Sequence, residues 1–423
     1  MIAIGLNLLE FHRPFLRFIG LVGYQVWFDR VKLIRQAIAG NPYSRDYLEE
    51  ENELCFALVE LTDVWDRNGR FPLTLRKKRH LFFAMAFVVQ AISLYDAVDE
   101  VSGKQLVRRI VGAMKSDPED IRALQVELAA ATHFLQSGYK VSFPDLDGEE
   151  RFDLLLHGID GREVEVECKF LSRDKGQKIH RGELLDFYRE VAPYLNSYIS
   201  TSSVDLIVEV TVPDRFPSQM QAKKEIANLV RSSISINKST ENDGIAIIDV
   251  RDATSMGLGH AADSGHIDRA HLDQVTGTDN KPMLVLGKKG GRTALLVVKS
   301  EKSDTLFESI YRTLSRAASK QLTGRRPAVL IARLGDIDKQ GLVRVAANEV
   351  GLDSGPNTLQ VIASRLMRGD HHQHLVCVCF LSESEVGVRE AGRTPSSGAV
   401  YHFKNEGSPF WKAGFDFGFA PIL

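Results

Sequence analysis

The chain has 423 residues, of which 44% are hydrophobic, so it is long enough for two or three domains with real cores. Its formal net charge of −2 gives no overall attraction to nucleic acid, which would therefore have to bind through local basic clusters. The chain carries only four cysteines and no recognisable signal peptide, a pattern typical of a protein from the reducing cytoplasm.

Residues 1–115 are predicted to be helical throughout. Residues 44–65 and 104–114 show the helical spacing of apolar side chains. Residues 81–95 are apolar but too short to span a membrane, so they predict a buried helix. The role of this region is unknown; one hypothesis is that it docks a protein partner or a second copy of the chain.

A helix is predicted over residues 116–137, because it opens on a capping residue followed by a proline and ends on a glycine. Its apolar residues recur at helical spacing and form a buried stripe: Ile121, Leu124, Leu128, Ala131 and Leu135. Glu127 lies on the flank of this stripe, near alanines that let a helix approach a sheet closely. Tyr139–Phe143 alternates and predicts the next strand.

Residues 151–156 and 163–169 are predicted to form a β-hairpin. The second segment alternates strictly, with Val164, Val166 and Cys168 on one face and Glu163, Glu165, Glu167 and Lys169 on the other. Like charges aligned on one strand face repel each other. A bound metal ion would relieve that repulsion, so the pattern suggests a metal site.

The register of the hairpin decides whether an aspartate joins this face. A two-residue turn, Asp160–Gly161, would place Asp153 opposite Cys168 on the apolar face. A three-residue loop, Ile159–Gly161, places Asp153 opposite Glu167 and also matches the apolar residues of the two strands. Burial favours the second register, since a slip of one residue turns every side chain to the other face.

The chain therefore presents a helix with Glu127, a strand, a hairpin with Asp153, and a strand with Glu167 and Lys169. This order resembles the PD-(D/E)xK nuclease superfamily, which includes many restriction endonucleases and Holliday-junction resolvases. The resemblance covers roughly residues 116–250.

The resemblance departs from the family pattern at one position, because Phe152 rather than proline precedes Asp153. A literal Pro144–Asp145 pair stands at the end of the preceding strand. We interpret that pair as a turn and assign the motif aspartate to Asp153.

The resemblance implies an α/β fold with a restriction-endonuclease-like mixed central sheet flanked by helices, and metal-dependent hydrolysis of phosphodiester bonds, with DNA as the favoured substrate. Asp153 and Glu167 would hold Mg²⁺ or Mn²⁺. The backbone carbonyl of Cys168 would be a further ligand, and Glu127 would bind directly or through water. Lys169 would orient the attacking water or stabilise developing charge. Glu165 is a spare carboxylate, for a second ion or for none.

Basic side chains follow the motif strand. These residues could bind phosphate groups beside the metal site, or they could form a solvated surface: Arg173, Lys175, Lys178 and Arg181. The basic stretch over residues 67–79 is explained at least as well by a solvated surface.

The rest of the chain continues as α/β. Helices are predicted over residues 182–195 and 218–233, and strands over residues 204–212, 244–250 and 375–381. Residues 251–282 predict a long loop. Residues 295–299, 304–322 and 328–333 predict a β-α-β unit that either extends the nuclease sheet or forms a separate module. We therefore expect three parts: a helical region (1–115), a nuclease core (116–250) and an α/β extension (251–423).

Two alternatives to an active nuclease stay open. The charged strand face could be solvated, with an incidental Glu-x-Lys pair, or the chain could be a catalytically inactive nucleic-acid-binding or assembly protein on the same fold. Two groups of residues could in principle bind a metal ion: His260, His266 and His271, and His371, His372, His374, Cys377 and Cys379. Neither group has a spacing fixed by a helix or strand. We interpret the first as part of a loop and the second as a loop followed by a buried strand.

Overall fold

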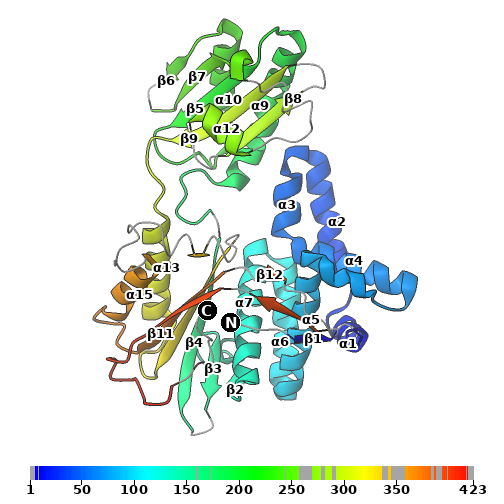
Figure 1. Cartoon of the computed structure of the whole chain (residues 1–423), viewed down its shortest axis with the longest axis vertical. Helices are drawn as coiled ribbons and strands as arrows, with labels where there is room; N and C mark the ends of the chain where they lie inside the picture. The colour runs from blue at the N-terminus through cyan, green and yellow to red at the C-terminus, as the bar shows by residue number, and fades with distance from the viewer. Residues whose placement is uncertain are drawn as a thin grey trace. The chain divides into compact units, whose positions relative to one another are not determined.

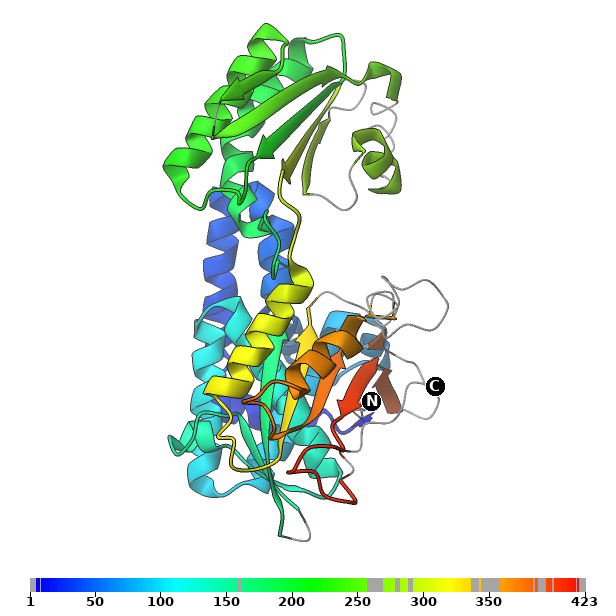
Figure 2. The ribbon, with the colours of Figure 1, turned by 90° about the vertical axis from the view of Figure 1, so that its left-hand side faces the viewer.

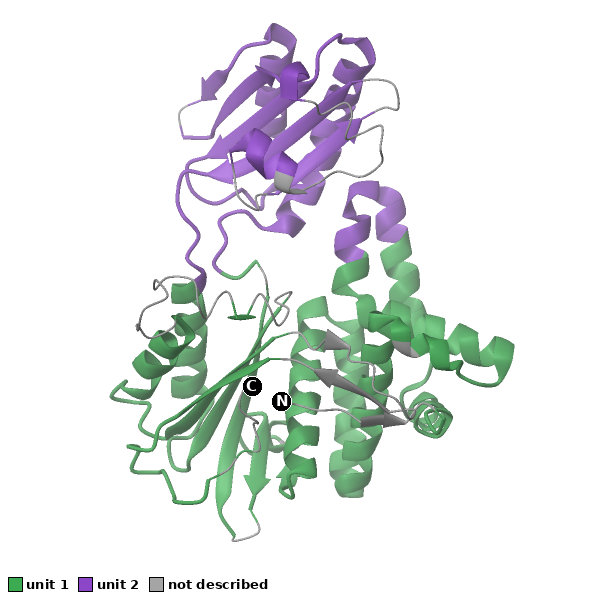
Figure 3. Cartoon of the chain, in the orientation of Figure 1, with its two compact units in different colours: residues 1–35, 49–175, 307–423 green, residues 36–48, 176–306 purple. Residues whose placement is uncertain are grey.

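The chain divides into two compact units (Figure 3). Unit 1 comprises Met1–Arg35, Glu49–Lys175 and Phe307–Leu423, and unit 2 comprises Gln36–Leu48 and Gly176–Leu306. The computed structural model describes residues 5–7, 9–158, 161–172, 174–242, 244–256, 269–277, 282–287, 292–335, 342–343, 358–382, 385–386, 393–397, 399–415 and 417. This division differs from the three expected parts, because residues 176–250 belong with unit 2 and the helical region shares a unit with the motif strand.

Unit 1 is built on a six-stranded mixed sheet with the order β14-β11-β10-β4-β3-β2. Its strands are β2 (Lys140–Ser142), β3 (Leu154–His157), β4 (Glu163–Leu171), β10 (Ala328–Leu334), β11 (Leu375–Leu381) and β14 (Val400–Lys404). The motif strand β4 lies inside the sheet, antiparallel to β3 and parallel to β10. The C-terminal strands β10, β11 and β14 therefore extend the sheet of the motif strand.

A layer of helices led by α7 covers one face of this sheet (Figure 1). The helices of the N-terminal region are α1 (His12–Val22), α2 (Gln25–Gly40), α3 (Arg45–Glu51), α4 (Glu53–Asn68), α5 (Arg79–Ala97), α6 (Glu100–Lys115) and α7 (Pro118–Gln136), with the 3₁₀ turns η1 (Pro42–Ser44) and η2 (Leu73–Lys77). Residues 36–48, which include η1, belong to unit 2. α7 packs on β4, and α5 and α6 pack on α7. One buried apolar cluster joins Phe87 of α5, Leu128 of α7 and Val166 of β4. The helical N-terminal region is confirmed, and part of it forms a layer on the sheet.

The opposite face of the sheet carries α13 (Leu306–Lys320) and α15 (Thr358–Met367) (Figure 1). A short helix, α8 (Pro144–Asp147), connects β2 to β3. A small sheet joins β1 (Gly5–Asn7), β13 (Arg393–Ser397) and β12 (Glu385–Val386). β1 is an exception to the expectation of an entirely helical N-terminal region.

Unit 2 contains a separate five-stranded mixed sheet with the order β6-β7-β5-β9-β8. Its strands are β5 (Leu206–Val212), β6 (Thr240–Asn242), β7 (Ala246–Asp252), β8 (Met283–Gly287) and β9 (Thr293–Ser300). Its helices are α9 (Arg181–Thr201), α10 (Met220–Ile236) and α12 (Arg269–Thr276), with the 3₁₀ turn η3 (Thr254–Met256). α9 and α10 pack with one side of the sheet, and Leu272 of α12 packs with Ile207 and Leu295 on the other.

Two expectations for this region are wrong. The strands over residues 204–212 and 244–250 form, but they do not continue the sheet of the motif strand. β9 and β10 lie in different sheets, so the expected β-α-β unit does not exist. The predicted loop over residues 251–282 contains η3 and α12 within its described part, while His260 and His266 lie outside the described residues.

Among the described residues, only α5 is long and apolar enough to meet the length-and-composition test for a membrane span. That test is weak for a single helix, and 61% of the apolar window is buried inside the protein. α5 therefore matches the buried helix expected over residues 81–95.

Candidate metal centre

The hairpin has the predicted register. Leu154 pairs with Val166 and Leu156 with Val164. At its tip, the Gly158 amide donates to the Arg162 carbonyl oxygen at 2.7 Å, and Gly161 has the positive φ of 78° that favours glycine. Residues 159–160 lie outside the described part, but the pairing is that of the three-residue loop.

This register brings Asp153 to β4. Asp153 directly precedes the first paired residue of β3, and its Oδ2 accepts a hydrogen bond from the Cys168 amide at 2.6 Å. The aspartate is thereby fixed against the strand that carries Glu167 and Lys169.

The charged face of β4 is not solvated. Both Glu165 and Glu167 have 0% of their surface exposed. Val164, Val166 and Cys168 face the other way, into the cluster shared with α7. The alternative of a solvated strand face is therefore wrong at Glu165 and Glu167.

Three carboxylates influence one another in this region. Burial, followed by the charge of Asp153, raises the pKa of Glu127 on α7 to about 8. The same two causes in the same order raise the pKa of Glu167 to about 8. Burial raises the pKa of Asp153 to about 6, while Lys169 opposes the rise. The structure thus brings Glu127, Asp153, Glu167 and Lys169 into one electrostatic group.

Two internal cations lie in this group. Lys169 forms an ion pair with Glu167 Oε1. Arg109 of α6 lies 2.8 Å from Asp120 Oδ1 and 3.4 Å from Glu127 Oε1. Burial alone would lower the pKa of Lys169, but the charges of Glu167 and Asp153 outweigh it and hold that pKa above its usual value. Lys169 is therefore a protonated donor at neutral pH.

The other oxygen of Glu167 is the unusual atom of the site. Oε2 is buried and has no hydrogen-bond partner within the described part of the chain. An unpartnered oxygen of a buried carboxylate costs about 1–3 kcal/mol or more. A cation or an ordered water at Oε2 would remove that cost.

The donor set fits Mg²⁺ or Mn²⁺, because it consists of carboxylate oxygens, one of them unpartnered. No three Asp, Glu, His or Cys residues in the described ranges form a ready-made metal cage. Mg²⁺ does not require one, since proteins usually hold it through one or two carboxylates, with water completing the shell.

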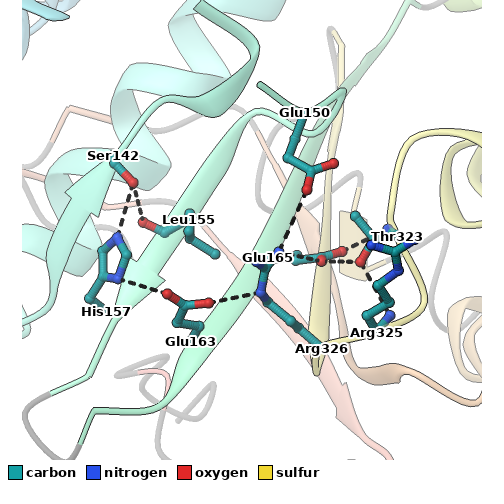
Figure 4. A network of polar contacts seen from close by, with 9 residues as sticks. All are labelled: Ser142, Glu150, Leu155, His157, Glu163, Glu165, Thr323, Arg325 and Arg326. Atoms are coloured by element: carbon teal, nitrogen blue, oxygen red, sulfur yellow. Dashed lines mark hydrogen bonds and ion pairs between the residues drawn. The ribbon is translucent and has the colours of Figure 1, made fainter. Parts of the chain in front are cut away.

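Glu165, considered above as a ligand for a second ion, takes part in a polar network with neighbouring residues (Figure 4). Its Oε2 accepts from the Thr323 amide at 2.8 Å, and its Oε1 accepts from the Thr323 hydroxyl and from Arg326 at 3.3 Å. Arg326 also pairs with Glu163 at 2.8 Å. Both oxygens of Glu165 are thus engaged, and the network fastens β4 to the segment that leads into β10.

The four basic residues expected to bind phosphates lie on both sides of the boundary between the two units or outside the described residues. Lys175 ends unit 1, whereas Lys178 and Arg181 belong to unit 2. Lys178 pairs with Asp214 at 2.7 Å, and the guanidinium of Arg181 lies 5.6 Å from the centre of the Tyr47 ring. Arg173 lies outside the described residues.

Sequence reasoning missed two neighbours of the site. Asp145 lies in the short helix α8 rather than in a turn, and its charge contributes to the raised pKa of both Glu127 and Asp153. The literal Pro144–Asp145 pair is the sequence signal for it. Arg109 gave no local signal, because its partners lie on another helix.

Two of the other histidines considered for metal binding lie beside backbone carbonyl oxygens, whereas the buried Nε2 of His374 has no partner among the described residues. His372 Nδ1 lies 2.9 Å from the Leu366 carbonyl oxygen, and His271 Nε2 lies 3.2 Å from that of Met256. Cys377 and Cys379 are buried on β11 with their sulfur atoms 3.6 Å apart.

Comparison of the chain with protein-family models, with curated proteins and with solved structures found no match. The function is therefore inferred from the residues and geometry of the site.

Proposed function

We propose that the chain is a metal-dependent nuclease that hydrolyses phosphodiester bonds, with DNA as the favoured substrate, and that it is a divergent relative of the PD-(D/E)xK nucleases. The observation that carries the proposal is the buried, unpartnered Oε2 of Glu167, beside Asp153 and the protonated Lys169. A carboxylate in that state favours a divalent cation, and the neighbouring ammonium suits a phosphate.

Asp153 and Glu167 would hold Mg²⁺ or Mn²⁺, with the Cys168 carbonyl oxygen and Glu127 as further ligands, as the family resemblance implies. When bound, the ion acidifies a water molecule and withdraws charge from a phosphate oxygen. The Cys168 amide holds Asp153 in place by its hydrogen bond of 2.6 Å. The carboxylates are thereby positioned before any substrate arrives.

Lys169 has the protonation state of a donor rather than of a base, because the pKa of its ammonium is raised. Its Nζ would donate to a phosphate oxygen on which negative charge develops as the water oxygen bonds to phosphorus. The bond from phosphorus to the leaving oxygen then breaks, and that oxygen takes up, through solvent, the proton that the attacking water gives up. Glu167 Oε1 keeps the ammonium at the site through their ion pair.

The proposal is tested with the full-length protein, circular single- and double-stranded DNA, and RNA, each with Mn²⁺ or with a chelator. We expect cleavage of DNA that requires the metal. Cleavage that persists after exhaustive metal removal would contradict the mechanism, and binding without turnover in either Mg²⁺ or Mn²⁺ would support the inactive alternative.

Lys169→Ala is expected to reduce cleavage about 10²-fold or more, because the developing charge loses its donor. Mn²⁺ binding should persist, since Asp153 and Glu167 remain. The comparison is made by single-turnover cleavage beside calorimetric Mn²⁺ titration. Wild-type rates in this variant would remove Lys169 from the mechanism.

A further inference from the structure

A basic surface lies on the two helices that cover the sheet face opposite α7. The side of α13 that packs inward carries Ile310, Leu314, Ala317 and Ala318. Its exposed side carries cations at every fourth position: Arg312, Arg316 and Lys320. Within the part of the chain that the structure describes, these three side chains form no ion pair.

α15 lies beside α13 and adds to the same surface (Figures 1 and 2). Arg365 of α15 pairs with Glu308 of α13 at 2.8 Å and lies 3.6 Å from the centre of the Tyr311 ring. Arg368 follows one turn later. The two helices are thus joined into one face by direct side-chain contacts.

The balance of charge on this face is strongly positive. In residues 306–320 and 358–368 the exposed cations are Arg312, Arg316, Lys320, Arg365 and Arg368, and the exposed anion is Glu308. Five cations less one anion leave +4, whereas the whole chain has a net charge of −2. So large a local excess in an acidic chain favours an anionic partner.

The face is also hollowed. A groove of about 580 Å³ is lined by Gln360, Val361, Ser364, Arg365, Arg368 and Gly369. Most of these residues offer polar donors, and Val361 is an exposed apolar side chain in the groove. This composition suits phosphate oxygens and gives little apolar surface for insertion into a lipid bilayer.

We propose that the α13–α15 face binds the phosphate backbone of duplex DNA, independently of sequence. The expected ligand is a duplex rather than a single strand, because proteins that bind single strands use exposed aromatic rings on which the bases stack. Tyr311, on the described part of this face, is covered by Arg365 instead. This inference rests on the proposed nuclease function, and it identifies duplex DNA as the form of substrate that the α13–α15 face would bind.

The test measures binding of a fluorescent DNA duplex to the full-length protein in a chelator, so that it does not depend on cleavage. The variant combines Arg312→Gln, Arg316→Gln and Lys320→Gln. The control combines Lys115→Gln, Lys140→Gln and Lys404→Gln, which remove the same charge from exposed positions elsewhere in unit 1. Circular dichroism of both variants checks that they fold.

We expect the α13 variant to bind at least about tenfold more weakly than the control and to lose roughly 2 to 3 units of the slope of log affinity against log salt. Equal binding by the two variants would overturn the proposal. Tighter wild-type binding to a single strand, or to vesicles of phosphatidylserine and phosphatidylcholine, would also overturn it. Loss of duplex binding in the α13 variant, together with no cleavage by the wild type in Mn²⁺, would uphold the surface and reject the nuclease.

Discussion

Glu167→Gln is expected to abolish DNA cleavage in Mn²⁺, by at least about 10²-fold, while the protein stays folded. The substitution keeps the shape of the side chain but removes the charge that would hold the metal. In a chelator at pH 7 its unfolding free energy should lie within about 1 kcal/mol of the wild type. The ion pair of Oε1 with Lys169 is lost, but burial raises the pKa of Glu167 to about 8, so the amide removes a charge that the folded protein already disfavours. Single-turnover cleavage and denaturant unfolding measure the two effects.

Glu165→Gln is the matched control. Glu165 lies on the same strand and the same face as Glu167, and both are fully buried. Its oxygens are engaged by Thr323 and Arg326, so the amide turns a donor toward a donor at one buried position and removes one of the partners of Arg326, which keeps Glu163. We expect a loss of about 2–4 kcal/mol of stability, with cleavage retained by the folded protein. Identical effects of the two substitutions on cleavage would refute the distinction between a metal ligand and a structural carboxylate.

The parts of the site that the sequence predicted are those encoded locally. Alternation along β4 separates Val166 from Glu167, and the length of the loop sets Asp153 against the same strand. The helix with Glu127 begins and ends where its proline and glycine indicate. Each of these features depends on residues a few positions apart, so a single sequence contains the whole signal.

The parts that could not be predicted depend on distant pairings. β4 lies beside β10, with Glu165 bonded to Thr323 from 158 positions away. No periodicity in the intervening chain reveals that residues 176–306 fold as another unit before the sheet resumes. Of the basic residues expected to bind phosphate, Lys178 belongs to that unit and pairs there with Asp214, a partner that the sequence does not reveal.

Glu127 illustrates why a site residue can be found while its surroundings are not. Its position on the flank of an amphipathic helix is visible in the sequence. The ion pair with Arg109 is not, because it depends on how α6 packs against α7. The contribution of Asp145 likewise depends on the path of α8 after β2, which a Pro-Asp pair alone does not determine.

The pH dependence of the metal-free protein is expected to reveal the buried carboxylates. The pKa of Glu127 and that of Glu167 rise from 4.5 to about 8, and that of Asp153 rises from 3.8 to about 6, with burial as the largest cause in each case. Between the ordinary and the raised values, the folded protein holds more protons than the unfolded chain. Its unfolding free energy therefore falls as pH rises from about 5 to about 8, by up to about 1.4 kcal/mol per pH unit for each group.

Metal affinity should change in the opposite direction, because protons and the metal compete for the same oxygens. Mn²⁺ should bind more tightly as pH rises from about 6 to about 8, and its binding should restore the stability lost at high pH. Glu167→Gln should flatten the decline in stability measured in a chelator, because it removes one of the groups with a raised pKa. Thermal unfolding across this pH range, with and without Mn²⁺, provides the measurement. Equal slopes in the wild type and in Glu167→Gln would mean that Glu167 is not the buried, proton-binding ligand on which the proposed centre depends.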